Sequence, residues 1–325
     1  MMYTTDQLIE KVSTEIAKLS FKKEPALLYD PIAYTMSQGG KRLRPLLSLV
    51  SCQMFNGNVD ESLIPAVSLE MFHNFTLIHD DIMDKAPIRR GVETVYKKWN
   101  DNVAILSGDT LFAMAYDHLM GYQKEQLKDL IRLLNQTAIG VCEGQQLDMD
   151  FETQEHVSID EYIEMIRLKT AILISACLKA GAITACASPE NQEKIYQYGE
   201  NIGLAFQLMD DLLDVFGDVS LFGKTNGGDI RENKKTFLYL KSLELAKGKD
   251  LKSLQYYFSH TDFDVVEKFE AVKLLFKKLK IQEVTETLMN AYFSKAQKIL
   301  ESIDVPVEQK AQLISLTEGI MLRDH

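Results

Sequence analysis

The stretch SPENQEKIYQYGENIGLAFQLMDDLLDVFG, residues 188–217, indicates the fold class. It begins with Ser188 as a helix cap, Pro189 at the first helical position and Glu190 in the first turn, a combination typical of helix starts. Apolar residues then recur at helical spacing for the rest of the stretch. We therefore expect one long helix that runs past Asp214.

Helical patterning of this kind extends through nearly the whole chain, and strand-like alternation is almost absent. Ser158-Ile159-Asp160-Glu161 is a capping box that opens a predicted helix through Lys169-Thr170. Another helix is expected from about Asp60 to the Asp80–Asp84 region. No Pro- or Gly-rich linker divides the chain, so we predict one all-α domain spanning residues 1–325. Loop signals occur at Gly39-Gly40, Ala86 to Gly91, Phe222-Gly223 and Asn226 to Gly228.

The composition of the chain limits its function. Its 325 residues are within reach of one large helical domain, and 46% hydrophobic with 26% charged residues is a globular composition. The net charge of −11 argues against a general nucleic-acid or anionic-membrane surface, which would need a basic face. An acidic protein can still bind an anionic substrate if it recruits metal cations or gathers its basic groups in one place.

The cysteines and the N-terminus favour a cytoplasmic protein. The cysteines show no CxxC pairing, so we expect reduced and mostly buried thiols. The N-terminus has no basic and apolar leader pattern. The most apolar stretch, Thr170 to Ala187, is interrupted by Lys179 and is better explained as a core helix than as a transmembrane segment. The cysteines are Cys52, Cys142, Cys177 and Cys186.

Two acidic clusters share a DDxxD spacing, Asp80-Asp81-Ile82-Met83-Asp84 and Asp210-Asp211-Leu212-Leu213-Asp214. On a helix, residues at i and i+4 project from one face, so each cluster crowds three carboxylates together. Their mutual repulsion is costly unless cations lie between them. Oxygen ligands suit a hard divalent ion, and magnesium usually shares its coordination shell with substrate phosphates. The clusters therefore predict a magnesium-dependent site for a diphosphate ester.

A solvated acidic face is the ordinary alternative for one such cluster. Both clusters end long apolar stretches, however, where a solvated face fits poorly. Gln207 lies three residues before Asp210 and four before Asp211, on the same helix face, and His73 lies two turns before Asp80. The alternative for each is a hydrogen-bonded core residue. Beside the carboxylates they become candidate substrate contacts.

Several basic residues lie near glycines or follow the acidic clusters. Each one taken alone is explained as surface charge. Together they predict two diphosphate-binding sets, one bridged by magnesium and one made only of Arg and Lys. These residues are Lys41, Arg42, Arg44, Arg89, Arg90, Lys169, Lys224, Lys234 and Lys235.

With these motifs in this order, the sequence resembles the trans-prenyltransferases, the polyprenyl diphosphate synthases of the farnesyl and geranylgeranyl type. The resemblance covers nearly the whole chain. The matching segments are Gly40-Lys41-Arg42-Leu43-Arg44-Pro45, His79 to Asp84 with Arg89-Arg90-Gly91, Gly108-Asp109-Thr110-Leu111, Gly144-Gln145-Gln146-Leu147-Asp148, Lys169-Thr170, Phe206 to Asp211 with Asp214, and Gly223-Lys224.

This resemblance implies a bundle of long helices around a deep central cavity, usually paired as a homodimer. It implies three magnesium ions that bridge the allylic diphosphate, two on Asp80 and Asp84 and one on Asp210. The other aspartates, acting directly or through water, would be Asp81, Asp211 and Asp214. The residues that match contacts to the allylic substrate are Arg89, Lys169, Thr170, Gln207, Lys224 and Lys234. Those that match contacts to isopentenyl diphosphate are Lys41, Arg44, His73 and Arg90.

The reaction implied by the resemblance joins isopentenyl diphosphate head to tail (1'-4) to dimethylallyl, geranyl or farnesyl diphosphate. Ionisation of the allylic C–O bond leaves a carbocation and a more negative diphosphate, whose charge magnesium, Lys169, Lys224 and Lys234 would stabilise. The isopentenyl double bond then attacks the cation. No side-chain base stands out, and the family's departing diphosphate is expected to take the proton. Closure must exclude water.

The residues before the first cluster bear on product length. The growing chain is expected to extend along the helix that leads back from Asp80. Phe75 lies five residues upstream, Thr76 four and Phe72 eight. An aromatic side chain five residues before Asp80 would form the floor of the pocket. We therefore expect an all-trans product of fifteen to twenty carbons, leaning to twenty. The alternatives are a farnesyl-only or a longer-chain enzyme, and ordinary core packing for Phe75.

Three other classes of protein share parts of this pattern. A terpene cyclase would carry an Asn/Ser/Glu-type second metal motif and would lack the basic isopentenyl-binding set. Head-to-head condensing synthases space their aspartates as DxxxD. A non-catalytic partner subunit tends to lose aspartates, whereas this chain keeps all six. The sequence therefore favours a catalytic prenyltransferase.

Overall fold

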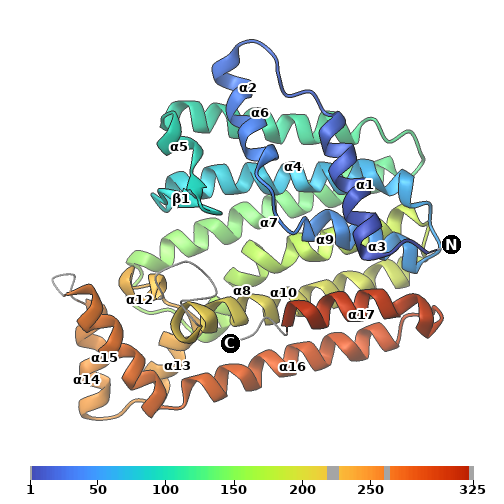
Figure 1. Ribbon diagram of the computed structural model, residues 1–325. Coiled ribbons are helices and arrows are strands. Elements are labelled where there is room, and N and C mark those ends of the chain that lie inside the picture. Colours follow the sequence, from blue (N-terminus) through green and yellow to red (C-terminus); the bar gives the residue numbers. More distant parts are fainter. Residues whose placement is uncertain (1, 218–226, 260–263, 322–325) are drawn as a thin grey trace. The chain divides into compact units, whose positions relative to one another are not determined.

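A computed structural model describes residues 2–217, 227–259 and 264–321 (Figure 1). Within these ranges the chain is almost entirely helical. The strands among them form one short antiparallel hairpin, β1 (Ile88–Arg89) and β2 (Val92–Glu93). The predicted all-α fold class is confirmed.

The chain folds into two compact units. Neither unit is a continuous piece of sequence. The expectation of one domain over residues 1–325 stays a prediction. The first unit comprises Met1–Gln136, Ala176–Tyr196 and Asp304–Leu313, and the second comprises Thr137–Ser175, Gln197–Ile303 and Ile314–His325.

The first unit is organised around one long helix, α4 (Val59–Met83). The Asn58 side chain caps this helix by accepting a hydrogen bond from the N–H of Asp60 at 3.1 Å. Most side chains from Val59 to Asn74 are buried on all sides, as expected of a helix enclosed by its neighbours. The surrounding helices are α1 (Thr5–Lys18), α2 (Ala26–Ser37), α3 (Leu43–Met54), α5 (Val95–Lys98) and α6 (Asp101–Leu119). Figure 1 shows α6 beside α4, with which it packs along much of its length.

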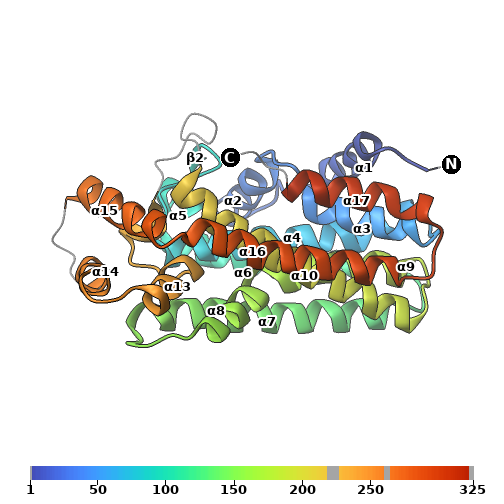
Figure 2. The same cartoon turned by 90° about the horizontal axis from the view of Figure 1, so that it is seen from below.

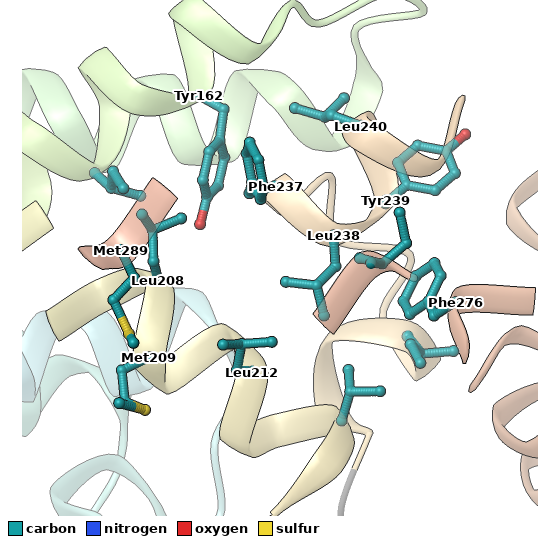
Figure 3. Packing of buried hydrophobic residues seen from close by; sticks show 14 of the residues in the cluster. Tyr162, Leu208, Met209, Leu212, Phe237, Leu238, Tyr239, Leu240, Phe276 and Met289 are labelled. Carbon is teal, nitrogen blue, oxygen red and sulfur yellow. The ribbon is translucent and has the colours of Figure 1, made fainter. Parts of the chain in front are cut away.

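The second unit has a hydrophobic core of its own, shown in Figure 3. Leu208 and Leu212 pack there with Tyr162, Phe237 and Phe276, which come from separate helices. Its helices, several of which share residues with the first unit, are α7 (Leu127–Thr153), α8 (Ile159–Ile166), α9 (Ile172–Thr184), α10 (Pro189–Phe216), α12 (Gly228–Arg231), α13 (Phe237–Leu245), α14 (Lys249–Ser259), α15 (Val265–Lys278), α16 (Ile281–Glu301) and α17 (Val307–Met321). Helix α14 lies beside α15 in both views (Figures 1 and 2).

The helix starts read from the sequence are confirmed. Ser158 and Glu161 form the capping box that begins α8, and α10 begins at Pro189 as expected. One feature was not predicted. The helix that starts at Ile159 is interrupted by a five-residue π-helix, η1 (Arg167–Ala171), before α9 continues. This π-helix contains Lys169 and Thr170.

The four cysteines are divided between buried and exposed positions. Cys52 and Cys177 are buried, but Cys142 and Cys186 are exposed, so the expectation of mostly buried thiols is only half right. Both exposed thiols lie on sides of helices or turns that face solvent, which the spacing of cysteines alone does not reveal.

Across the described ranges, no helix is both long enough and apolar enough to cross a membrane.

Candidate active site

The first aspartate cluster occupies the last turn of α4. Asp80 and Asp81 are helical, and Asp84 is the C-cap, whose N–H donates to the Asp80 carbonyl at 2.8 Å. Arg89 of β1 reaches back to the cluster, with Nε 2.6 Å from Asp81 Oδ1 and Nη2 3.3 Å from Asp80 Oδ2. Asp80 and Asp84, one turn apart, share a helix side.

Asp81 differs from its two neighbours because it is buried. Burial raises the pKa of its carboxyl to about 6, although the charge of Arg89 and its hydrogen bond act in the opposite direction. Asp84 is exposed. The carboxylates of this cluster therefore differ in their surroundings: Arg89 holds Asp81, whereas Asp84 is open to solvent.

The first unit also contains a basic set, formed by five of the predicted basic residues: Lys41, Arg42, Arg44, Arg89 and Arg90. Arg42 has a left-handed backbone (φ 44°), and its guanidinium forms a buried ion pair with Glu70 at 2.7 Å. A second nitrogen of Arg42 donates to the carbonyl of Met36 at 2.7 Å. Arg90 Nη1 donates to the Gly39 carbonyl at 3.3 Å. These contacts hold the glycine loop, on which the exposed Lys41 lies.

His73 lies in the positive field of this basic set. Its side chain is only 7% exposed. Its pKa is well below the ordinary value, first because of burial and then because of the charges of Arg44, Arg90, Arg89 and Arg42. A neutral imidazole near four guanidinium groups is an environment that favours an anion.

The second aspartate cluster lies near the end of α10. Asp211 is buried, and both of its oxygens accept hydrogen bonds from neutral groups, Tyr162 Oη at Oδ2 and Gln207 Nε2 (3.2 Å) at Oδ1. Thr170 Oγ1 donates to Gln207 Oε1 at 2.9 Å. Burial is the main reason that the pKa of Asp211 is well above its ordinary range, and the nearby charge of Asp229 adds to it.

Asp214 is attached to the turn that follows. Its Oδ1 accepts a hydrogen bond from the N–H of Gly228 and its Oδ2 one from the N–H of Asp229, both at 3.1 Å. Asp229 is itself buried, and burial together with the charge of Asp214 raises its pKa to about 7. The attachment fixes Asp229 beside the cluster.

The lysines of the second unit have different partners. Lys169 Nζ is 2.5 Å from Asp148 Oδ2, and Lys234 Nζ is 3.4 Å from Glu232 Oε2. The ammonium of Lys235 donates to carbonyls at the end of α7, those of Phe151 and of Gln154 among them. A cation at a helix C-terminus satisfies carbonyls that have no partner within the helix. Lys224 lies outside the described residues.

A pocket of about 100 Å³ in the second unit brings several of these side chains together. Its lining mixes carboxylates, ammonium groups and apolar side chains, which suits a ligand with a charged head and an apolar tail. Among the predicted residues it collects Lys169, Thr170, Gln207, Asp211 and Lys234. Its other polar members are Asp148, Glu152, Tyr162, Asp229, Lys235 and Thr236. Of these, the sequence had marked only Asp148, within a matching segment, and Lys235, among the basic residues.

The predicted product-length residues belong to an aromatic cluster of the first unit. The Phe75 ring stacks on Phe112 of α6, with centroids 4.9 Å apart and planes 29° from parallel. Phe72 contacts both rings. Thr76 Oγ1 donates to the His73 carbonyl at 2.8 Å. Phe112 was not predicted, since no local motif marks it.

Neither cluster forms a closed metal cage. Among the described residues, no group of three or more acidic, histidine or cysteine side chains converges closely enough to hold a metal ion. The donors present are carboxylate oxygens, and magnesium is commonly held by one or two carboxylates while waters and substrate phosphates complete its shell. The donor set therefore fits magnesium shared with a phosphorylated substrate.

Comparisons with known proteins agree with this chemistry. The family profile described as polyprenyl synthetase matches residues 25–275. The chain is 36% identical over 302 residues to the short chain isoprenyl diphosphate synthase of Methanothermobacter thermautotrophicus, covering 93% of this chain and 92% of the relative. It is 34% identical to the geranylgeranyl pyrophosphate synthase of Geoglobus acetivorans, covering 97% and 96%. A crystal structure of a geranylgeranyl pyrophosphate synthase matches with a TM-score of 0.94 and 44% identity over 100% of both chains.

Helical fold, paired aspartate clusters and basic set together define a prenyltransferase, and the chain belongs to the polyprenyl synthetase family. It is an enzyme that makes short-chain prenyl diphosphates, which confirms the class predicted from the motifs. The family depends on magnesium and uses isopentenyl and allylic diphosphates.

Proposed function

We propose that the enzyme condenses isopentenyl diphosphate head to tail with an allylic diphosphate and releases a product of fifteen to twenty carbons, leaning to twenty. The allylic primer is dimethylallyl, geranyl or farnesyl diphosphate. The two similar proteins named above as geranylgeranyl pyrophosphate synthases support a twenty-carbon product. The stacked rings of Phe75 and Phe112 also support it, because they would block a longer chain.

The protein is acidic overall, yet it has two kinds of group that can bind an anion: the basic side chains around His73 and the acidic clusters that can recruit magnesium. This contrast is the observation that carries the proposal. The surroundings of His73 are basic, and His73 itself is uncharged, so it can donate a hydrogen bond to a phosphate without titrating near neutral pH. We propose that Lys41, Arg44, His73 and Arg90 bind isopentenyl diphosphate in this way. Guanidinium groups suit this task because they bind phosphate oxygens in pairs.

The allylic diphosphate is bound differently in this proposal. Asp80 and Asp84 would hold two magnesium ions, and Asp210 would hold a third. Bound magnesium would neutralise the diphosphate and stabilise the charge that develops as the C–O bond breaks. Asp81 and Asp211 orient the clusters through Arg89 and Gln207. Asp214 holds the turn that carries Asp229.

Basic and neutral side chains complete the allylic site. Lys169 and Lys234, which line the pocket of the second unit, offer ammonium groups to the departing diphosphate, where the negative charge grows during ionisation. Thr170 and Gln207 are held by their mutual hydrogen bond and present polar groups to the same pocket. By its position in the motif, Lys224 is proposed as a further contact. Apolar lining excludes water, which would quench the carbocation.

A homodimer in the cytoplasm is the proposed state of the enzyme. Exposed apolar side chains of α6 and its C-cap support the dimer, because Ile105 and Leu106 are 43% and 59% exposed and Met120 is 56% exposed. Large apolar side chains gathered on one surface often mark a protein interface. The sequence has no CxxC pair of cysteines, which supports the cytoplasmic location.

A product assay tests the proposal. The purified chain is incubated with isopentenyl diphosphate and each of the three primers in turn, and the products are sized after removal of the diphosphate. With magnesium we expect accumulation at twenty carbons from every primer, and with excess chelator no product. No condensation by the pure protein with magnesium would favour a non-catalytic partner subunit. Cyclic hydrocarbons would favour a terpene cyclase.

A further inference from the structure

The π-helix η1 lies where two proposed substrate contacts are located. The N–H of Ile172 donates to the carbonyl of Arg167, five residues earlier, which is the bond that defines a π turn. Lys169 and Thr170 lie inside this turn. A π turn is uncommon, and its extra residue changes the direction of the side chains that follow. Such turns persist where neighbouring structure holds them.

Two glycines from other helices touch the backbone of η1. A Cβ atom on Gly144 of α7 would be 2.4 Å from the backbone nitrogen of Lys169 and 2.8 Å from its Cα. A Cβ atom on Gly203 of α10 would be 2.5 Å from the Cα of Ala171 and 2.6 Å from its Cβ. All four distances are shorter than the 3.0 Å below which real Cβ contacts essentially never occur. Any larger residue would therefore push the turn itself.

The side chains of η1 continue into the second aspartate cluster. Thr170 donates to Gln207, Gln207 donates to Asp211, and Tyr162 donates to the other oxygen of Asp211. Lys169 is held on the α7 side by its ion pair with Asp148. Displacing the turn would therefore move an ammonium group and a chain of hydrogen bonds together.

We propose that Gly144 and Gly203 are positioning residues for the reaction. By allowing α7 and α10 to contact the π turn, they set Lys169 and Thr170 against Gln207 and Asp211, and so fix the groups that receive the allylic diphosphate. The role rests on the proposed function. Neither glycine touches substrate, and each acts through the turn.

The experiment compares two glycines of α7 that lie one turn apart, in the full-length chain. Gly144→Ala presses on the backbone of Lys169. Gly140→Ala is the matched control, because the nearest atoms to its Cβ would be side-chain atoms and not backbone: Ile172 Cδ1 at 2.6 Å, Leu168 Cδ2 at 3.4 Å and Ile172 Cγ1 at 4.0 Å. For both variants we would measure kcat, KM for each substrate and the thermal unfolding midpoint.

We expect Gly144→Ala to lower kcat/KM for the allylic substrate by about 100-fold, a loss that a displacement of about 1 Å can cause. Its KM for isopentenyl diphosphate and its unfolding midpoint should match those of Gly140→Ala, which stays close to the wild type. Equal kinetics for the two variants would overturn the proposal. So would an equal rise in both KM values with a lowered midpoint, because that result indicates a structural role alone.

A second pair of variants decides the matter if Gly144→Ala does not fold. Gly203→Ala is expected to show the same selective loss, and adding Ala171→Gly should restore part of the activity by removing one of the two close contacts. No restoration, or no loss in Gly203→Ala, would contradict the role. Wild-type enzyme is assayed in parallel. A wild type that fails to condense the substrates refutes the proposed function, whereas an active wild type with normal glycine variants refutes only the positioning role.

Discussion

Asp80→Ala is expected to reduce kcat at least about 1,000-fold at saturating substrates, comparable with the loss of a major charge-stabilising group in other enzymes. Asp80 and Asp84 share a side of α4 and are the proposed ligands of two magnesium ions. Removing one carboxylate therefore weakens the binding of both ions. A steady-state assay across magnesium concentrations measures the effect. The apparent KM for magnesium should rise together with the loss in kcat.

The control for this variant is Asp60→Ala. Asp60 lies in the first turn of the same helix, where it pairs with Lys11 on the surface, so its loss should lower stability slightly and leave kcat unchanged. Asp81→Asn provides a graded comparison. Because Asp81 is bound by Arg89, its substitution is expected to lower kcat less than the substitution of Asp80 does. If Asp80→Ala kept more than a tenth of wild-type kcat at the wild-type magnesium requirement, the assignment of Asp80 as a ligand would be wrong.

The second large effect is on product length. Phe75→Ala is expected to yield products longer than twenty carbons, because it removes a ring from the stack proposed to end the pocket. Phe112 remains in that variant, with its ring 5.2 Å from Tyr116, so part of the barrier persists. The double variant Phe75→Ala/Phe112→Ala should therefore extend the product further than either single change. Chromatography of the dephosphorylated products measures the shift.

Phe55→Ala is the control for the loss of an aromatic ring. Phe55 caps the C-terminus of α3, outside the stacked cluster, so its loss should leave product length unchanged. If neither Phe75→Ala nor the double variant lengthened the product, the two rings would be ordinary core packing. The floor of the pocket would then have to be sought elsewhere.

Much of the fold was predictable because it depends on local sequence. The caps at Ser158 and Ser188 are short motifs whose partners lie within a few residues, and the structure begins α8 and α10 there. The aspartate clusters were found in the same way, since spacing within one helix decides which side chains share a face. The sequence also indicated that Asp80 and Asp84 share a helix side.

The remaining features depend on contacts between residues far apart in the chain. Tyr162 binds Asp211 across 49 positions, and nothing near Tyr162 in the sequence indicates this role. Lys235 was grouped with Lys234 as a candidate cation, yet its ammonium holds the end of α7. The π-helix was missed for the same reason. Two glycines far away in the sequence, Gly144 and Gly203, lie against this turn, whereas the local pattern of residues 158–184 predicts an uninterrupted helix.

In the proposed enzyme, one diphosphate is bound through magnesium on the acidic clusters and the other by basic side chains alone. Calorimetric titration of the wild-type enzyme, with magnesium and then with excess chelator, tests it most directly. The ligands are isopentenyl diphosphate and an allylic diphosphate analogue that cannot ionise. We predict that chelation leaves the Kd of isopentenyl diphosphate unchanged and weakens the analogue about 100-fold or more, as expected for the loss of several kcal/mol of metal–phosphate interaction. An analogue that binds equally well without magnesium, or loss of both ligands on chelation, would contradict the claim.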